Sequence, residues 1–175
     1  FGFTQMDQDM FAINSHLNAL NSKKYLIDEI VNIGPENTLF DPYARNLNLK
    51  LCERAPKLFG SITYANTAIS ADAASFVVIC RNIIKGRKAL KLISGATVGA
   101  NPKLPGLAPI TAIEEVFQAS GLRQKNINQV EVMEAYASQA MACLSESGLG
   151  NVKTNPKGGA LARGHPIGAS GTILV

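Results

Sequence analysis

The chain has 175 residues, of which 46% are hydrophobic and 17% charged, a composition that supports a packed core and excludes a disordered protein. Its net charge of +4 comes from scattered basic residues, which argues against a nucleic-acid partner. The three cysteines are widely spaced and form neither a disulfide nor a zinc pattern, and no apolar run is long enough to cross a bilayer. We therefore expect a reduced, cytoplasmic protein with no metal and no membrane partner.

The first predicted element is a long helix. Thr4 and Asp7 have the spacing of a capping box at its start. An apolar stripe follows at steps of three and four residues, and we expect it to face the core: Met6, Met10, Ile13, Leu17 and Leu20. His16 lies beside this stripe, and we expect a helix-face histidine without chemistry.

The middle of the chain predicts short strands between loops. Residues 27–33 predict a strand, and residues 34–57 a loop with a short helix around residues 45–53. The apolar run at residues 76–80 predicts a strand buried on both faces, and residues 81–86 predict a short helix.

The remaining segments predict strands and helices in alternation, the pattern of an α/β layer structure. They are a strand (89–99), a proline-rich loop (101–109), a helix (111–121), a strand followed by a turn (127–137), a helix (138–148) and the start of another helix (171–175). The predicted helix 111–121 ends at Gly121 and carries Ala112, Val116 and Ala119 on one side. A domain boundary near residues 86–89 fits the point where the alternation begins.

Residues 155–171 read NPKGGALARGHPIGASG and concentrate glycines around His165. Gly158 and Gly159 permit a tight turn or a close backbone approach, and His165 stands between a glycine and a proline. One interpretation is a histidine beside an anion or a developing oxyanion; the other is a glycine-rich connector with a buried, hydrogen-bonded histidine. The phosphate-loop patterns GxxxxGK[ST] and GxGxxG are both absent.

The whole pattern N-x-x-G-G-x-L-A-x-G-H-P-x-G-x-S-G resembles the second signature of the thiolases. The Gly-His-Pro resembles thiolases more than the related ketoacyl synthases, where Gly-His-Thr is usual. Four further segments resemble thiolase segments and occur in thiolase order: residues 6–16, 61–75, 105–122 and 130–144.

This resemblance implies an incomplete, thiolase-like layered α/β/α fold, with a mixed five-stranded-type sheet covered by helices. Residues 1–88 would hold the loop-domain helix and the end of the N-terminal domain, and residues 89–175 most of a truncated C-terminal domain. The implied function is a thiolase-type acyltransferase of fatty acid metabolism that makes or cleaves 3-ketoacyl-CoA (acetoacetyl-CoA or longer) through an acyl-cysteine. Coenzyme A or acyl-CoA would be the substrate, with no permanently bound cofactor, and a homodimer or homotetramer is implied.

The resemblance also implies roles for individual residues. His165 matches the family histidine that donates to the oxyanion and activates the thiolate. Met133 stands where the family has an asparagine that holds an oxyanion-hole water, and a thioether donates no hydrogen bond. The weaker substrate or coenzyme A contacts implied are Ala68, Gly106, Leu107, Ala135 and Tyr136.

None of the three cysteines matches a family catalytic cysteine, so we interpret Cys52, Cys80 and Cys143 as structural and expect this chain alone to be inactive. Two alternatives are open. One is a divergent, non-catalytic protein of this type that binds acyl-CoA, which the loss of asparagine at Met133 favours. The other is a generic phosphate- or nucleotide-binding α/β module, which would need a phosphate loop.

Overall fold

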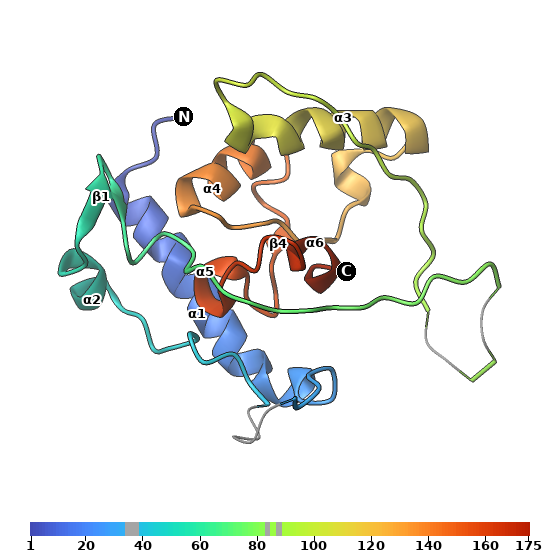
Figure 1. Cartoon of the computed structure of the whole chain (residues 1–175). Helices are drawn as coiled ribbons and strands as arrows, with labels where there is room; N and C mark the ends of the chain where they lie inside the picture. Colours follow the sequence, from blue (N-terminus) through green and yellow to red (C-terminus); the bar gives the residue numbers. More distant parts are fainter. Residues whose placement is uncertain (34–38, 83–84, 87–88) are drawn as a thin grey trace.

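The longest element of the computed structural model is helix α1 (Gln5–Leu26), and the shorter helices α4 (Ala137–Glu146) and α5 (Ala160–Arg163) pack against it (Figure 1). The structure describes residues 1–33, 39–82, 85–86 and 89–175. The other helices described are α2 (Leu49–Glu53), α3 (Ala108–Ser120), α6 (Ser170–Ile173) and the 3₁₀ turns η1 (Pro105–Leu107) and η2 (Gln124–Asn126).

The capping box at the start of α1 is confirmed, but its predicted buried face is wrong. Thr4 and Asp7 exchange the two capping hydrogen bonds. Most of the apolar stripe faces outward, with Met6 54% and Leu17 51% exposed, although Ile13 packs against the core. The buried face carries small and polar residues instead: Gln8, Asp9, Ala12, Ser15, His16, Ala19, Ser22 and Leu26. Small side chains let α4 and α5 approach closely. The buried polar side chains have hydrogen-bond partners in other segments, namely Ser61, Glu134, Pro156, Arg45 and Asn66.

The strand predictions for residues 27–33, 76–80 and 89–99 are wrong. The first segment leaves α1 through a turn, in which the N–H groups of Glu29 and Ile30 donate to the Leu26 carbonyl. The other two belong to a long extended excursion that runs out to the right in Figure 1. Among the described residues no strand pairs with either segment, and Phe76 is 94% exposed. An apolar run favours a strand, but only a neighbouring strand completes its hydrogen bonds.

The predicted helix at residues 81–86 falls partly outside the described residues. Arg81 and Asn82 form a bend, and residues 85–86 form a turn. The short helix expected around residues 45–53 is present as α2, which Asn48 caps with its side chain.

The strands of the described segments form two small sheets in place of the expected larger one. β1 (Lys57–Phe59) and β2 (Ile62–Thr63) are antiparallel, whereas β3 (Gln129–Val130) and β4 (Lys153–Thr154) are parallel. The pair β3–β4 brings the segment before Met133 beside the segment that leads to His165. The mixture of helix and parallel sheet is that of an incomplete α/β fold.

The predicted helices of the C-terminal half are confirmed as α3 and α4. Gly121 ends α3 in the left-handed conformation, with φ 69°. The contacts of α3 with the core come from Ile113 and Phe117, rather than from the predicted face, on which Ala119 is exposed. Two core clusters surround α4: one holds Ala12, Leu47, Cys52, Ala65, Ala137 and Leu161, and the other Val132, Ala140, Leu144 and Leu149.

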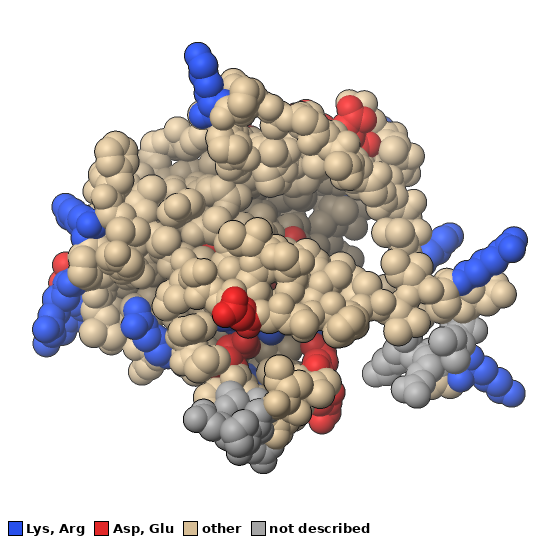
Figure 2. Space-filling model, in the orientation of Figure 1, with Lys and Arg blue, Asp and Glu red and all other residues tan. Residues whose placement is uncertain are grey.

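The described residues contain no helix that is long and apolar enough to cross a membrane. On the face shown in Figure 2, Lys and Arg side chains stand in separate groups around the margin and form no continuous basic patch.

Candidate active site

A buried carboxylate joins three separate segments of the chain. Glu134, between β3 and α4, is only 1% exposed. Its Oε2 accepts hydrogen bonds from the Ser15 hydroxyl at 2.7 Å and the Leu161 N–H at 3.1 Å. Its Oε1 accepts one from Nδ2 of Asn155 at 2.6 Å. Burial raises the pKa of Glu134, while these three hydrogen bonds act to lower it.

Asn155, the first residue of the glycine-rich stretch, pins this stretch to the segment before Met133. Its φ of 42° is in the left-handed region, which asparagine tolerates better than most residues. Its side chain accepts a hydrogen bond from the Val132 N–H at 2.8 Å and donates one to the Val132 carbonyl at 2.9 Å. The side-chain amide of Asn155 thereby makes the two backbone hydrogen bonds that a neighbouring strand would make, at a position beyond the end of β3.

Gly158 and Gly159 allow close approach to the protein itself. A Cβ atom at Gly158, where φ is 82°, would lie 2.5 Å from the Cβ of Ala19 in α1. A Cβ atom at Gly159 would lie 2.2 Å from Oε2 of Glu134. The N–H of Gly159 donates to the Ser15 hydroxyl oxygen at 2.9 Å. Packing therefore explains these two glycines in this chain, because a larger residue at either position would prevent the turn from lying between α1 and Glu134.

His165 is held by its backbone and by its ring. Its N–H donates to the Ile69 carbonyl at 2.7 Å, and residues 70 and 165 form an isolated parallel bridge. The ring Nδ1 lies 2.8 Å from the hydroxyl oxygen of Ser170, at the start of α6. Gly164 precedes His165 with φ 88° and no room for a Cβ beside Ala71. The predicted helix after the histidine is confirmed, but only as the single turn of α6.

A pocket of about 200 Å³ lies beside the His165 loop. Its lining includes Tyr43, Ala71, Met133, Gly164, Pro166 and Ser170. The structure thus brings Met133 to one cavity with Gly164 and Pro166, the two neighbours of His165 in the chain, whereas His165 is not among the lining residues. The ion pair between Nε of Arg163 and Oδ2 of Asp41, at 2.8 Å, also borders this pocket.

Three of the five weaker candidate residues are brought together. The N–H of Ala68 donates to the Ala135 carbonyl at 3.0 Å, and Tyr136 forms an antiparallel bridge with Thr67. Gly106 and Leu107 lie apart from this group, on η1. A Cβ at Gly106 would lie 3.2 Å from the Gln139 side chain, which places η1 one turn further along α4.

His16 has a structural position, as expected. It is buried in α1, and its Nδ1 accepts a hydrogen bond from the Arg45 N–H at 3.2 Å. Burial, together with the nearby charge of Arg45, lowers the pKa of His16 to about 4. The ring is therefore neutral at physiological pH and serves as an acceptor.

Two of the three cysteines have the buried positions of structural residues. Burial raises the pKa of Cys52 to about 11, and it also raises the pKa of Cys143. A thiol with a raised pKa is a poor nucleophile at neutral pH. Cys80 is exposed and lies in the extended segment that follows Ser75, which corrects its interpretation as a structural residue.

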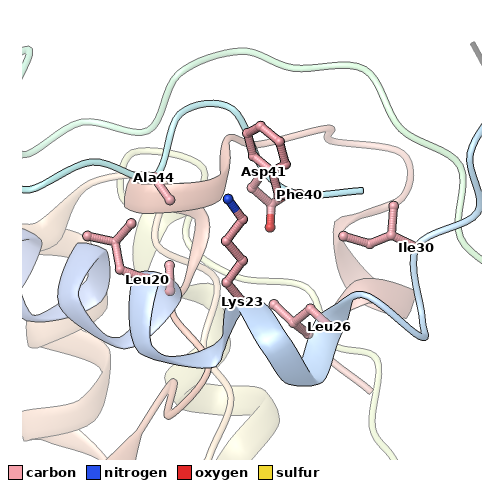
Figure 3. A pocket seen from close by; sticks show the side chains of 8 residues that line it. Leu20, Lys23, Leu26, Ile30, Phe40, Asp41 and Ala44 are labelled. Atoms are coloured by element: carbon pink, nitrogen blue, oxygen red, sulfur yellow. The ribbon is translucent and has the colours of Figure 1, made fainter. Parts of the chain in front are cut away.

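A second, smaller pocket of about 80 Å³ lies between α1 and the segment 40–44 (Figure 3). The Lys23 side chain rises from α1 towards Phe40 and Asp41, and its Nζ lies 3.8 Å from the centre of the Phe40 ring. No group of three His, Cys, Asp or Glu side chains in the described segments could hold a metal ion.

Four side chains that organise the site were missed by the sequence reasoning: Ser15, Glu134, Asn155 and Ser170. All lie inside segments already quoted for their resemblance, but polar residues in an apolar context were given no role. Glu134, directly after Met133, was the available signal, since a carboxylate within an apolar segment must find donors.

Comparison with known proteins places these segments in one family. Residues 87–175, just over half of the chain, match the family described as "Thiolase, C-terminal domain". A peroxisomal 3-ketoacyl-CoA thiolase of Encephalitozoon cuniculi is 34% identical over 99% of the chain and 47% of its own length. A β-ketoadipyl-CoA thiolase of Acinetobacter baylyi is 32% identical over 100% of the chain and 48% of its own length.

Solved structures agree with these sequence relatives. Human mitochondrial 3-ketoacyl-CoA thiolase superposes with a TM-score of 0.84 at 26% identity, over 98% of this chain and 47% of its own. The acetyl-CoA acetyltransferase of Syntrophomonas wolfei gives 0.78 at 27% identity, over 99% and 48%. The expected fold is confirmed, and the chain spans about half the length of the relatives it matches.

Proposed function

This chain belongs to the thiolase family, and we propose that it forms part of a thiolase-type acyltransferase that makes or cleaves 3-ketoacyl-CoA, acetoacetyl-CoA or longer. The reaction proceeds through an acyl-cysteine, and coenzyme A thioesters are substrates rather than bound cofactors. The observation that supports this proposal is the setting of His165: its ring contacts Ser170, and Ser170 lines the same pocket as Met133.

Within this proposal, His165 activates the nucleophile and stabilises the thioester oxyanion. Preorganised donors are what such an oxyanion requires. Ala68, Ala135 and Tyr136 line the route of the pantetheine arm, since two hydrogen-bonded segments bring them together; Gly106 and Leu107 contribute from η1. The nucleophilic cysteine comes from outside these 175 residues, because Cys52 and Cys143 are buried and none of the three cysteines matches a family catalytic cysteine.

The finer organisation is also a proposal. Residues 1–88 belong to a loop domain and the end of an N-terminal domain, and residues 89–175 to a C-terminal domain; the family match beginning at residue 87 supports this division. A homodimer or homotetramer, checked by light scattering, and a cytoplasmic location, checked by fractionation, complete the proposal. Peroxisomal names among the relatives make the fractionation a real test.

The test of the proposed function is thiolysis of acetoacetyl-CoA by the full-length protein, with and without His165→Ala. We expect turnover, covalent labelling of one cysteine by acyl-CoA, and a loss of about 100-fold or more in the variant. Absence of both turnover and labelling would refute the proposal. Heat protection by ATP or NAD, with none from coenzyme A, would favour the nucleotide-binding alternative.

Met133 supports a second candidate function, an acyl-CoA-binding member of the family without catalysis. Loss of one oxyanion-hole donor typically costs about 100- to 1000-fold in rate. Met133→Asn should therefore raise a slow thiolysis rate in the full-length protein, whereas the matched Met133→Leu should not. Acyl-CoA binding without turnover in both variants would establish the second candidate. A measurable wild-type rate that Met133→Asn leaves unchanged would show that the missing donor does not matter here.

A further inference from the structure

The His165 ring is placed by a short chain of hydrogen bonds that begins at a buried hydroxyl. Ser170 is 5% exposed, and its Oγ lies 2.8 Å from Nδ1 of His165. The same hydroxyl donates to the Pro166 carbonyl, four residues earlier, at 2.9 Å. That carbonyl also accepts the N–H groups of Ala169 and Ser170, each at 2.9 Å, which fixes its position at the start of α6.

The position of the Ser170 hydroxyl hydrogen determines which tautomer of His165 can bond to it. A serine hydroxyl has one hydrogen. We assign it to the 2.9 Å contact with the Pro166 carbonyl, which has the four-residue back-bonding geometry common for serine in helices. Ser170 therefore meets the ring as an acceptor. A neutral imidazole carries one N–H, and here it must be on Nδ1. We propose that Ser170 is a positioning residue that holds His165 in the Nδ1–H tautomer and leaves the Nε2 lone pair free.

This inference rests on the proposed function for its chemical meaning. With Nε2 unprotonated, the ring accepts the proton of a cysteine thiol: the S–H bond breaks, an Nε2–H bond forms, and a thiolate and an imidazolium result. The new Nε2–H then serves as the donor to the thioester oxygen. In the opposite tautomer, Nε2 already carries a hydrogen and cannot accept the thiol proton.

The other histidine of the chain, His16, is expected to have the opposite tautomer and can serve as an internal comparison. Nδ1 of His16 accepts a hydrogen bond from the Arg45 N–H, so the hydrogen of this neutral ring is on Nε2. The two histidines of the chain are thus expected to show opposite tautomers in one molecule.

Long-range ¹H–¹⁵N correlation spectra of the full-length protein test this directly, at a pH well above the ordinary histidine value of about 6.5. Signals are assigned with His16→Asn and His165→Asn. We expect an Nε2–H pattern for His16 and an Nδ1–H pattern for His165. In Ser170→Ala, the His165 pattern should move towards a mixture of tautomers while that of His16 stays fixed. Ser75→Ala is the matched control, since its hydroxyl donates to the Ala169 carbonyl and does not contact His165.

An Nε2–H pattern for His165 in the wild type overturns the inference even if Ser170→Ala fails to fold. An unchanged His165 pattern in folded Ser170→Ala overturns it as well. Kinetics provide a second readout: kcat should fall by up to about 100-fold in Ser170→Ala, the lower end of what a positioned general base contributes, with KM for acyl-CoA nearly unchanged. Absence of thiolysis in a protein with the expected tautomers would refute the proposed function and leave the tautomer assignment in place.

Discussion

Oε1 of Glu134 and Nδ2 of Asn155 lie 2.6 Å apart, and this buried hydrogen bond joins the residue after Met133 to the first residue of the glycine-rich stretch. The other carboxylate oxygen holds α1 through Ser15 and α5 through Leu161. All of these partners are donors. The distance between position 133 and the His165 loop is therefore set by a residue that itself has no part in the proposed chemistry.

Glu134→Gln should lower the free energy of unfolding by about 1–3 kcal/mol. The substitution replaces one acceptor oxygen by an NH₂ group, which is itself a donor, so the donors that contacted this oxygen lose their hydrogen bonds. Urea denaturation measures the change. Glu131→Gln is the matched control, because Glu131 is only half-buried and accepts a side-chain hydrogen bond from Gln129; we expect a change below about 0.5 kcal/mol. Equal effects of the two substitutions would contradict the role of Glu134.

Gly159→Ala should be among the most damaging small substitutions in the chain. Its Cβ would lie 2.2 Å from the Glu134 carboxylate and 2.5 Å from Nδ2 of Asn155, and both side chains are buried and hydrogen-bonded to each other. We expect a loss of about 3 kcal/mol or more, or no soluble protein. Gly168→Ala in the same stretch, where a Cβ meets nothing within 4 Å, should change stability by about 0.5 kcal/mol or less. Thermal unfolding of both variants makes the comparison.

His16 should make the stability fall in mild acid. Its pKa is lowered to about 4 in the folded state, so between pH 6.5 and 4 the unfolded chain binds the proton and the folded chain does not. The free energy of unfolding should therefore decrease as the pH falls through this window, by up to about 3 kcal/mol. His16→Asn keeps an acceptor for the Arg45 N–H and should remove this part of the pH dependence. An identical pH profile in both proteins would be evidence against a neutral, buried His16.

The three cysteines should react at very different rates with a thiol reagent. Cys80 is exposed and should be labelled first, whereas Cys52 and Cys143 are buried thiols with raised pKa values and should be protected until the protein unfolds. Mass spectrometry after timed labelling, with a urea-unfolded sample as the control, gives the order. Early labelling of Cys52 would show that α2 opens readily.

Local signals were predicted well from the sequence, because the residues that decide them are close in the chain. The Thr4–Asp7 capping box and the glycine that ends α3 both depend on neighbours within four residues. Which face of a helix is buried, and which residues its side chains contact, was not predictable in this way. Met6 and Leu17 have helical spacing, yet Ser15 and His16 on the other side of α1 are buried, because Glu134 and Arg45 supply their hydrogen bonds from distant segments.

The site was predicted in part for the same reason. His165 and Met133 were identified by the pattern around them, and the structure places Met133 and the neighbours of His165 on one pocket. Ser170, five residues after the histidine, was not predicted to contact the ring. Its contact with Nδ1 depends on the backbone path through Pro166 and the short α6, which no periodicity shows.

Gly158 and Gly159 pack closely against α1 and Glu134, so they are needed for folding rather than for the proposed chemistry. A protein of this fold that had lost its activity would still have to keep both glycines. Recognition of the family and competence for the reaction therefore depend on different positions within the same seventeen-residue stretch and its surroundings. The family assignment rests on residues 87–175 as a whole, whereas the judgement of activity depends on His165, Ser170 and the residue at position 133.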